Sequence, residues 1–274
     1  MNACEINLHT HTRRCKHARG CAADYCKAAV MYGIKVLGFS EHSPFPDDHL
    51  SETRLTFGEM DEYCRETVAA GKDFPELCIL TGLEVDTDTD CPPEFFVELK
   101  EKYKLHFLAA GAHFVRNSEG ALINAGINKH HREETVLLFI EKTIRLIESG
   151  AFSFITHPDM IAGSIDAMTT EIEKMFISLA HASIRHRTPL EINAYGLRKA
   201  VVEYPGGEQR NPYPYLPFWQ ICGKLQVPCI VGSDAHAPED LGSSSVAAAY
   251  RIAGLAGLTP CNAETFRTIT GNRK

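Results

Sequence analysis

Short apolar runs alternate with stretches of helical periodicity along nearly the whole 274-residue chain. Apolar runs of strand length are predicted to form strands at residues 6–9, 35–40, 78–85, 105–114, 152–157, 189–193 and 228–233. Apolar residues recur at helical spacing in the segments that follow, which predicts helices at 23–33, 57–71, 131–150, 169–186, 215–226, 244–257 and 262–271. Strands this short and apolar are typical of a buried parallel sheet.

The alternating order of strands and helices implies parallel strands joined by right-handed crossovers. An open, doubly wound sheet and a closed barrel both fit this order. The chain has no internal repeat or low-complexity tract, and the segment nearest to a linker is YPGGEQRNPYPY at 204–215. Its turn residues predict a long surface loop over one end of the fold. We therefore expect a single α/β domain over residues 1–274.

Polar side chains follow the predicted strands at the points where the strands end. The carboxyl ends of parallel strands meet on one side of such a fold, and that side carries the active site. Seven of the thirteen histidines lie there, including one on the first loop. The metal-ligand candidates at this end are His9, His11, His17, His42, Glu84, His113, His157, Asp234 and His236, and Asn193 and Arg198 follow the sixth strand.

Imidazole and carboxylate ligands suit Zn, Mn or Fe in hydrolytic centres. One ion takes three or four protein ligands, so nine candidates suffice for two or three ions if Glu84 or Asp234 bridges. Metals held about 3.5–4 Å apart can activate a bridging water and clamp a phosphoryl group during in-line displacement. Cys15 and Cys21 flank His17, but their spacing does not match the usual zinc–thiolate sites.

Composition narrows the possible functions. Hydrophobic residues make up 44% and charged residues 23% of the chain, which is ordinary for a globular protein with a full core. The net charge of −7 argues against a binder of long nucleic acid. We find no signal peptide and no apolar run approaching the roughly 18 residues of a membrane span. The ten cysteines form no CxxC pair, so we expect reduced thiols and a cytoplasmic protein.

Eight sequence features carry a resemblance to a known family. They are HTHT (9–12), His17, FSEHSP (39–44), GLEVD (82–86), GAHF (111–114), THPD (156–159), EINAYGLRK (191–199) and GSDAHAPEDLG (232–242). In this order they resemble the polymerase-and-histidinol-phosphatase (PHP) family, in its histidinol-phosphatase-like branch. The resemblance implies a distorted seven-stranded, TIM-like (β/α) barrel that holds three divalent ions, of Zn, Mn or Fe.

The resemblance also assigns the ligands. It implies one ion on His9, His11, Glu84 and Asp234, a second on His17, His42 and His236, and a third on Glu84, His113 and His157. A metal-bridging hydroxide would attack phosphorus, with Asp234, His236, Glu84 and Arg198 as catalytic residues. The implied reaction is hydrolysis of a small phosphomonoester, with histidinol phosphate as the leading candidate substrate.

The chain departs from the family's pattern in its phosphate-binding arginines. Arg198 matches one such arginine, but the segment HPDMIAGSID after the fifth strand lacks the second. Arg116 is a candidate substitute, as are Arg13 and Arg14, and Asn193 is expected beside the substrate or a ligand. A phosphodiesterase acting on nucleotides, an amide or lactone hydrolase and a noncatalytic metal-binding domain are the alternatives. Metal identity and oligomeric state stay open.

Overall fold

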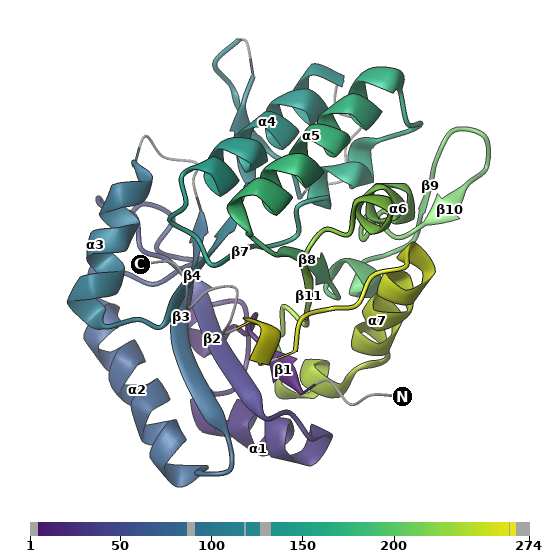
Figure 1. Ribbon diagram of the computed structural model, residues 1–274. Helices are drawn as coiled ribbons and strands as arrows, with labels where there is room; N and C mark the ends of the chain where they lie inside the picture. Colours follow the sequence, from purple (N-terminus) through teal and green to yellow (C-terminus); the bar gives the residue numbers. More distant parts are fainter. Residues whose placement is uncertain (1–4, 87–90, 118, 127–132, 263, 267–274) are drawn as a thin grey trace.

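Seven parallel strands form a nearly closed barrel in the computed structural model, which describes residues 5–86, 91–117, 119–126, 133–262 and 264–266 (Figure 1). A parallel bridge between Thr10 and Ala235 brings the last strand back to the first. The predicted TIM-like barrel is therefore confirmed, with each expected strand present. In spatial order the strands are β1 (Ile6–Asn7), β2 (Val36–His42), β3 (Cys78–Asp86), β4 (Phe107–Gly111), β7 (Phe154–Ile155), β8 (Leu190–Asn193) and β11 (Cys229–Gly232).

Helices surround the outside of the barrel (Figure 1). The helix over 93–103 was not expected, because it is rich in charge and buries only Phe96 and Leu99. Most of the helix expected at 262–271 lies outside the described residues. Within the described residues, no helix is long and apolar enough to cross a membrane. The helices are α1 (Ala22–Tyr32), α2 (Met60–Asp73), α3 (Pro93–Tyr103), α4 (Glu133–Glu148), α5 (Thr170–His186), α6 (Leu216–Leu225) and α7 (Ser244–Ala256).

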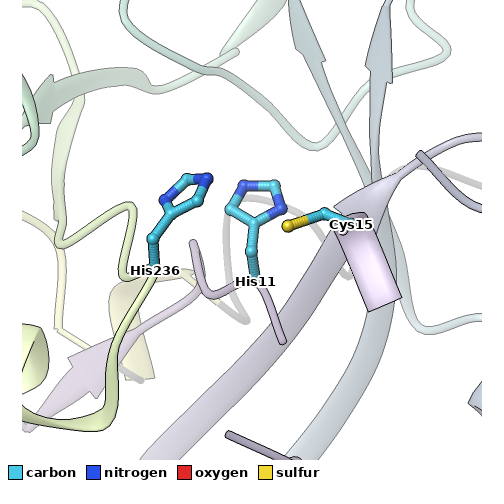
Figure 2. Close-up of side chains that lie close together, drawn as sticks. All are labelled: His11, Cys15 and His236. Atoms are coloured by element: carbon cyan, nitrogen blue, oxygen red, sulfur yellow. The ribbon is translucent and has the colours of Figure 1, made fainter. Parts of the chain in front are cut away.

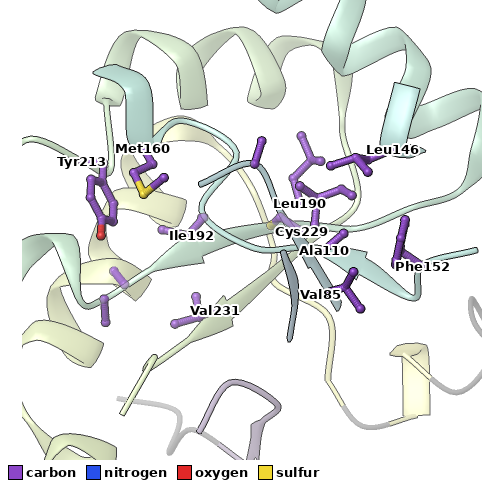
Figure 3. Close-up of a cluster of buried hydrophobic side chains, with 14 of the residues drawn as sticks. Val85, Ala110, Leu146, Phe152, Met160, Leu190, Ile192, Tyr213, Cys229 and Val231 are labelled. Carbon is purple, nitrogen blue, oxygen red and sulfur yellow. The ribbon is translucent and has the colours of Figure 1, made fainter. Parts of the chain in front are cut away.

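Alternation along the strands divides the apolar core into two parts. Leu108 belongs to the larger cluster, part of which Figure 3 shows, whereas its neighbour Phe107 belongs to a smaller one. The smaller cluster draws on the other face of the strands and contains Ile6, Leu8, Val36, Phe107, Ala109, Phe154, Ile230, Cys261 and Phe266. The barrel interior is thus filled with side chains, and the polar residues lie beyond this filling at the carboxyl ends of the strands.

In the described part of the chain, two short hairpins and five 3₁₀ turns lie in the loops that connect the barrel elements. The hairpins are β5 (Phe114–Arg116) with β6 (Leu122–Asn124), and β9 (Val202–Glu203) with β10 (Gln209–Arg210). The turns are η1 (Arg13–Cys15), η2 (Phe57–Glu59), η3 (Met160–Ser164), η4 (Gly196–Arg198) and η5 (Pro238–Gly242). All of them follow strands or connect helices to strands, so they shape the loops and leave the barrel unchanged.

The segment 204–215 is not simply the surface loop that its turn residues predicted. Tyr204, Tyr213 and Tyr215 in it are each no more than 5% exposed. The buried carboxylate of Asp159 explains part of this, since its Oδ2 accepts hydrogen bonds from Tyr215 N at 2.6 Å and Trp219 Nε1 at 2.8 Å. Tertiary contacts therefore hold this segment against the mouth of the barrel.

Replacing Asp159 with alanine is expected to lower the free energy of unfolding by about 3 kcal/mol, because two buried N–H donors lose their acceptor. Asp159→Asn keeps an acceptor oxygen and should cost no more than about 1 kcal/mol. Urea unfolding followed by the fluorescence of Trp219, the single tryptophan, measures both. Equal losses in the two variants would show that the hydrogen bonds do not account for the effect.

A comparison of the wild type with Asp159→Asn tests the protonation of Asp159. Burial raises the pKa of this carboxyl to about 7. Between about pH 4 and pH 7 the folded protein therefore holds a proton that the unfolded chain has released. The contribution of this group to the free energy of unfolding is complete below about pH 4 and is lost as pH rises towards 7. The wild type should lose stability relative to Asp159→Asn over that range.

Candidate metal centre

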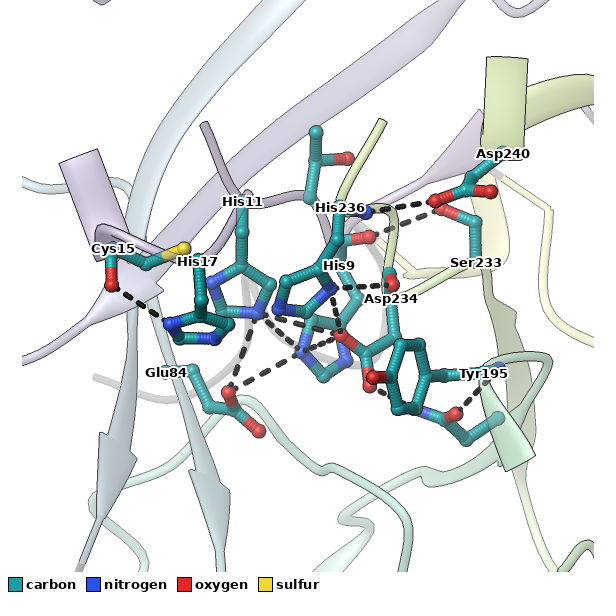
Figure 4. Close-up of polar contacts among 12 residues, drawn as sticks. His9, His11, Cys15, His17, Glu84, Tyr195, Ser233, Asp234, His236 and Asp240 are labelled. Carbon is teal, nitrogen blue, oxygen red and sulfur yellow. Dashed lines mark hydrogen bonds and ion pairs between the residues drawn. The ribbon is translucent and has the colours of Figure 1, made fainter. Parts of the chain in front are cut away.

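Glu84, near the end of β3, contacts several histidines of the polar cluster, and Figure 4 shows its contacts with His9 and His11. Its Oε1 is 2.9 Å from His157 Nε2 and accepts a hydrogen bond from Thr156 Oγ1 at 2.8 Å. Its Oε2 is 3.0 Å from His42 Nδ1. The same oxygen is 3.4 Å from Nε2 of both His9 and His11. One carboxylate thus faces histidines from three strand ends.

The structure brings the nine candidate ligands together in adjoining groups. Three groups each place their donor atoms within 4.8 Å of one another: His9, His11 and Glu84; His17, His42 and His236; and Glu84, His113 and His157. Asp234 joins the first group, with Oδ1 3.5 Å from Nε2 of His9 and of His11. These are the groupings that the family resemblance implied. Their occupation by metal ions stays a prediction.

The donor atoms face one another in a way that suits cations. His9 Nε2 and His11 Nε2 are 3.1 Å apart, so their facing lone pairs need a shared proton or a positive ion. Burial disfavours a charge on His11, but hydrogen bonds to Glu41 and Glu84 outweigh it and raise its pKa to about 9. Burial and the charge on His11 lower the pKa of His236 to about 3. Bound divalent ions would replace the shared protons, and each imidazole would then bind metal in its neutral form through a ring-nitrogen lone pair.

A second layer of carboxylates and amides orients these ligands. Glu191 Oε1 is 2.8 Å from His9 Nδ1, and Glu191 Oε2 accepts a hydrogen bond from His157 N at 3.0 Å. Asn193 Nδ2 donates to Asp234 Oδ2 at 3.1 Å, which fits the expected role of Asn193 in orienting a ligand. Sequence reasoning missed Glu191, although its position two residues before Asn193 puts it on the same face of β8.

Two of the candidate ligands have unusual backbone conformations. Asp234 has φ +48° and His157 has φ +30°, both in the left-handed region that residues with a Cβ rarely adopt. Such strain of about 1–3 kcal/mol per residue persists only where surrounding contacts impose it, and it is concentrated at functional sites. The fold thus directs the side chains of Asp234 and His157 into the polar cluster, and the strained backbone at both residues is a local energetic cost.

Cys15 lies beside the second group. Figure 2 shows its thiol next to His11 and His236, and these three residues also form a group that could hold a metal. Burial raises the pKa of this thiol to about 12, so it is protonated at neutral pH. Cys21 donates a hydrogen bond to Asp24 instead of approaching His17. Among the described residues, Cys15, Cys26, Cys222 and Cys229 are buried and form no disulfide bond.

A pocket of about 410 Å³ opens above the cluster. His17, His42, Glu84, His113, His157, Asp234 and His236 line it, together with the hairpin residues Phe114 and Asn124. Its lining also contains two cationic residues, Arg54 and Lys199, which sequence reasoning missed. Arg54 lies in the loop between β2 and η2, and Lys199 directly follows the η4 turn, where periodicity does not predict the direction of a side chain. Lys199 ends the motif EINAYGLRK, in which only Asn193 and Arg198 were considered.

The structure does not place the predicted phosphate-binding arginines in the lining of this pocket. Arg116 is exposed on β5 and donates to Gly120 O at 2.9 Å. Arg14 pairs with Glu66 at 2.6 Å. The Arg198 guanidinium donates to main-chain oxygens of the β11 loop. Their roles at the substrate stay predictions.

A parallel barrel with adjoining histidine–carboxylate groups at its carboxyl end defines a class of barrel proteins whose mouth carries residues that could hold metal ions. The family model named PHP domain matches residues 7–195, and a second, named PHP-associated, matches 219–258. The chain belongs to the PHP family, as its motifs indicated.

Curated relatives span almost the same length. A Deinococcus radiodurans protein named "Probable histidinol-phosphatase" is 26% identical over 259 residues, which cover 92% of this chain and 94% of the relative. The histidinol-phosphatase of Bacillus subtilis is 24% identical over 263 residues, with 85% and 94% covered. Among solved structures, histidinol phosphate phosphatase from Lactococcus lactis, complexed with zinc, L-histidinol and phosphate, matches with a TM-score of 0.67. It is 17% identical and the match covers 94% of this chain and 95% of that one, which shows a shared fold.

Proposed function

We propose that this protein is a metal-dependent phosphomonoesterase whose substrate is L-histidinol phosphate, which it hydrolyses to histidinol and phosphate. The observation that carries the proposal is the convergence of three donor groups around Glu84 beneath a pocket of about 410 Å³. A pocket of this size suits a small molecule. The names of the two curated relatives and the ligands of the Lactococcus lactis structure support this choice of substrate.

The proposal places three divalent ions, of Zn, Mn or Fe, on the three groups. Bound there, they would activate water and neutralise charge on the phosphate oxygens. Asp234 suits a ligand better than a proton donor: burial favours its neutral form, but His9 and His236 outweigh burial and lower its pKa. Asn193 keeps the carboxylate of Asp234 oriented by donating to it. Glu84, Asp234, His236 and Arg198 are the residues we propose as essential for catalysis.

We extend the proposal to the whole chain. One barrel domain over residues 1–274 would supply the complete site, because β1 and β11, from opposite ends of the sequence, both end at it. We also propose a cytoplasmic location, which is supported by Cys15, Cys26, Cys222 and Cys229 forming no disulfide bond among the described residues. The substrate is a small phosphorylated molecule, without long nucleic acid as a partner.

The test is phosphate release by purified protein whose metal content has been measured. We expect kcat/KM for histidinol phosphate of about 10⁴ M⁻¹s⁻¹ or more, and much lower values for sugar phosphates, phosphoamino acids, nucleoside monophosphates and a phosphodiester. His236→Ala should abolish turnover. The matched control is His181→Ala on α5, where the histidine is exposed, and it should keep full activity.

The substrate panel separates the alternatives. Fast hydrolysis of another monoester with slow hydrolysis of histidinol phosphate would retain the chemistry and reject the substrate. Preference for the diester would favour the phosphodiesterase. Absence of hydrolysis of every ester by a fully metal-loaded protein would reject the phosphatase assignment.

A further inference from the structure

Arg198 and Lys199 are adjacent in the sequence but have different surroundings. Arg198 Nη1 donates to Ser233 O at 3.0 Å and to Ser245 Oγ at 3.2 Å, and its Nη2 donates to Asp234 O at 2.8 Å. Its Nε is 3.6 Å from Asp240. The guanidinium is therefore occupied with holding the loop that carries Asp234 and His236, and it has few donors left for a ligand.

The ammonium group of Lys199 lies between two aromatic rings of the pocket. Its Nζ is 5.3 Å from the ring centroid of Tyr195 and 5.6 Å from that of Tyr213. The Tyr195 ring is 5.2 Å from the His236 ring, and the Tyr213 ring is 6.4 Å from the His157 ring. The lysine thus lies at the pocket wall between two tyrosine side chains. One tyrosine adjoins the candidate ligand group of His236, and the other adjoins the candidate ligand group of His157.

Close packing holds this arrangement in place. A Cβ on Gly196, three residues before Lys199, would lie 2.3 Å from the carbonyl oxygen of Tyr213. Only glycine lets the η4 turn approach the segment that carries Tyr213 this closely. The position of Lys199 beside the two rings is therefore a product of the fold and not of a freely moving surface side chain.

The charge of Lys199 is not balanced locally. No carboxylate of the described residues lies within 4.0 Å of its Nζ, and the most significant acidic influence on it is Asp234. Its one hydrogen bond among those residues goes to Gly126 O at 3.3 Å, so two of its three N–H donors remain available. Burial lowers the pKa of this ammonium, as expected for a half-buried cation that lacks a counter-ion.

Arg54, the other cation of the pocket, differs in this respect. Its Nη2 donates to Asp86 Oδ2 at 3.1 Å and its Nη1 to Ser43 O at 3.3 Å. Its guanidinium carbon lies 3.8 Å from the ring centroid of Phe45. Arg54 is thus paired and packed, so of the two cations among the described residues that line the pocket, Lys199 is the one suited to an incoming anion.

We propose that Lys199 binds the phosphate group of the substrate and takes the place of the arginine that this chain lacks after its fifth strand, while Arg198 positions the loop of Asp234 and His236. This inference rests on the proposed phosphatase function, since it assigns a phosphate to the pocket. A lysine binds phosphate as a point charge, whereas an arginine binds it through a planar pair of donors. The aromatic walls of Tyr195 and Tyr213 would exclude water from this contact and strengthen it.

The experiment is calorimetric titration of inorganic phosphate into zinc-loaded protein, with zinc content measured for each variant. Lys199→Met should raise the Kd for phosphate about tenfold or more, as expected for loss of a charge-assisted hydrogen bond. Lys199→Arg should restore most of the affinity. Lys224→Met is the matched control, because Lys224 is exposed near the end of α6, and it should leave the Kd unchanged.

Three results would overturn the inference. An unchanged Kd in Lys199→Met would show that the lysine does not contact phosphate. A raised KM for esters with an unchanged phosphate Kd would assign it to the leaving group. Loss of zinc or of the folded state in both Lys199→Met and Lys199→Gln would make it a structural residue. Because phosphate binding needs no turnover, a protein inactive on every ester but dependent on Lys199 for phosphate binding would reject the phosphatase proposal alone.

Discussion

Replacing Glu84 with glutamine is expected to lower kcat/KM about a thousandfold and to reduce the number of zinc ions bound per chain. The carboxylate oxygens lie within 3.7 Å of nitrogens of five histidines, which come from four strand ends. An amide offers one acceptor oxygen and no charge, and its NH₂ group would face imidazole or metal. Removing one charge from a buried cluster costs about 3–5 kcal/mol, which corresponds to rate losses of this order.

Metal analysis and steady-state kinetics on the same preparation measure both effects of Glu84→Gln. Glu98→Gln on α3 is the matched control, since that glutamate is exposed, and it should retain wild-type zinc content and rate. A Glu84→Gln protein with full zinc content and full activity would contradict the central, shared position of this carboxylate. Full zinc content with lost activity would place its effect on the reaction instead of on metal binding.

Replacing Gly232 with alanine is expected to destabilise the protein by about 3 kcal/mol and to weaken zinc binding. A Cβ at this position, at the end of β11, would lie 1.7 Å from Glu191 Oε1. That oxygen is also 2.8 Å from His9 Nδ1, so moving it releases the ligand His9 from its orienting partner. Overpacking of a buried site costs about 1–3 kcal/mol, and disturbing the carboxylate network adds to it.

Urea unfolding at a fixed zinc concentration, with zinc content determined in parallel, measures the effect of Gly232→Ala. Gly254→Ala is the matched control because Gly254 lies inside α7 with open space around the added Cβ. The control should gain up to about 1 kcal/mol from its higher helix propensity. Equal stability changes in the two variants would show that Glu191 can move away without cost.

The strands along the chain and the nine candidate ligands could be predicted from the sequence. Parallel strands all release their last side chains on one side of the sheet, so position along the chain translates directly into position in space. His42, Glu84 and His157, for example, each follow an apolar run. His42 Nδ1 and His157 Nε2 both lie within hydrogen-bonding distance of the Glu84 carboxylate. Local pattern was sufficient because each ligand depends only on the end of its own strand.

Other features needed the tertiary structure. The family resemblance implies a phosphate-binding Arg198, and that role stays a prediction. The structure adds that its guanidinium donates to Ser233 and Asp234, more than thirty residues away along the chain. Lys199 enters the pocket because Tyr213 packs against the preceding turn. Similarly, the hydrogen bond from Tyr215 N to Asp159 joins segment 204–215 to a residue far away along the chain.

The sequence by itself thus determined the alternation of parallel strands and helices, the polar residues at the strand ends and the chemical class of the site, because these follow from periodicity and from side chains that end strands. Closure into a barrel was implied by the family resemblance and is confirmed by the structure. Only the tertiary structure decided which cation faces the pocket, which carboxylate orients His9 and how the 204–215 segment is held. These features arise from contacts between loops distant in sequence, where side-chain direction depends on packing that no local pattern records.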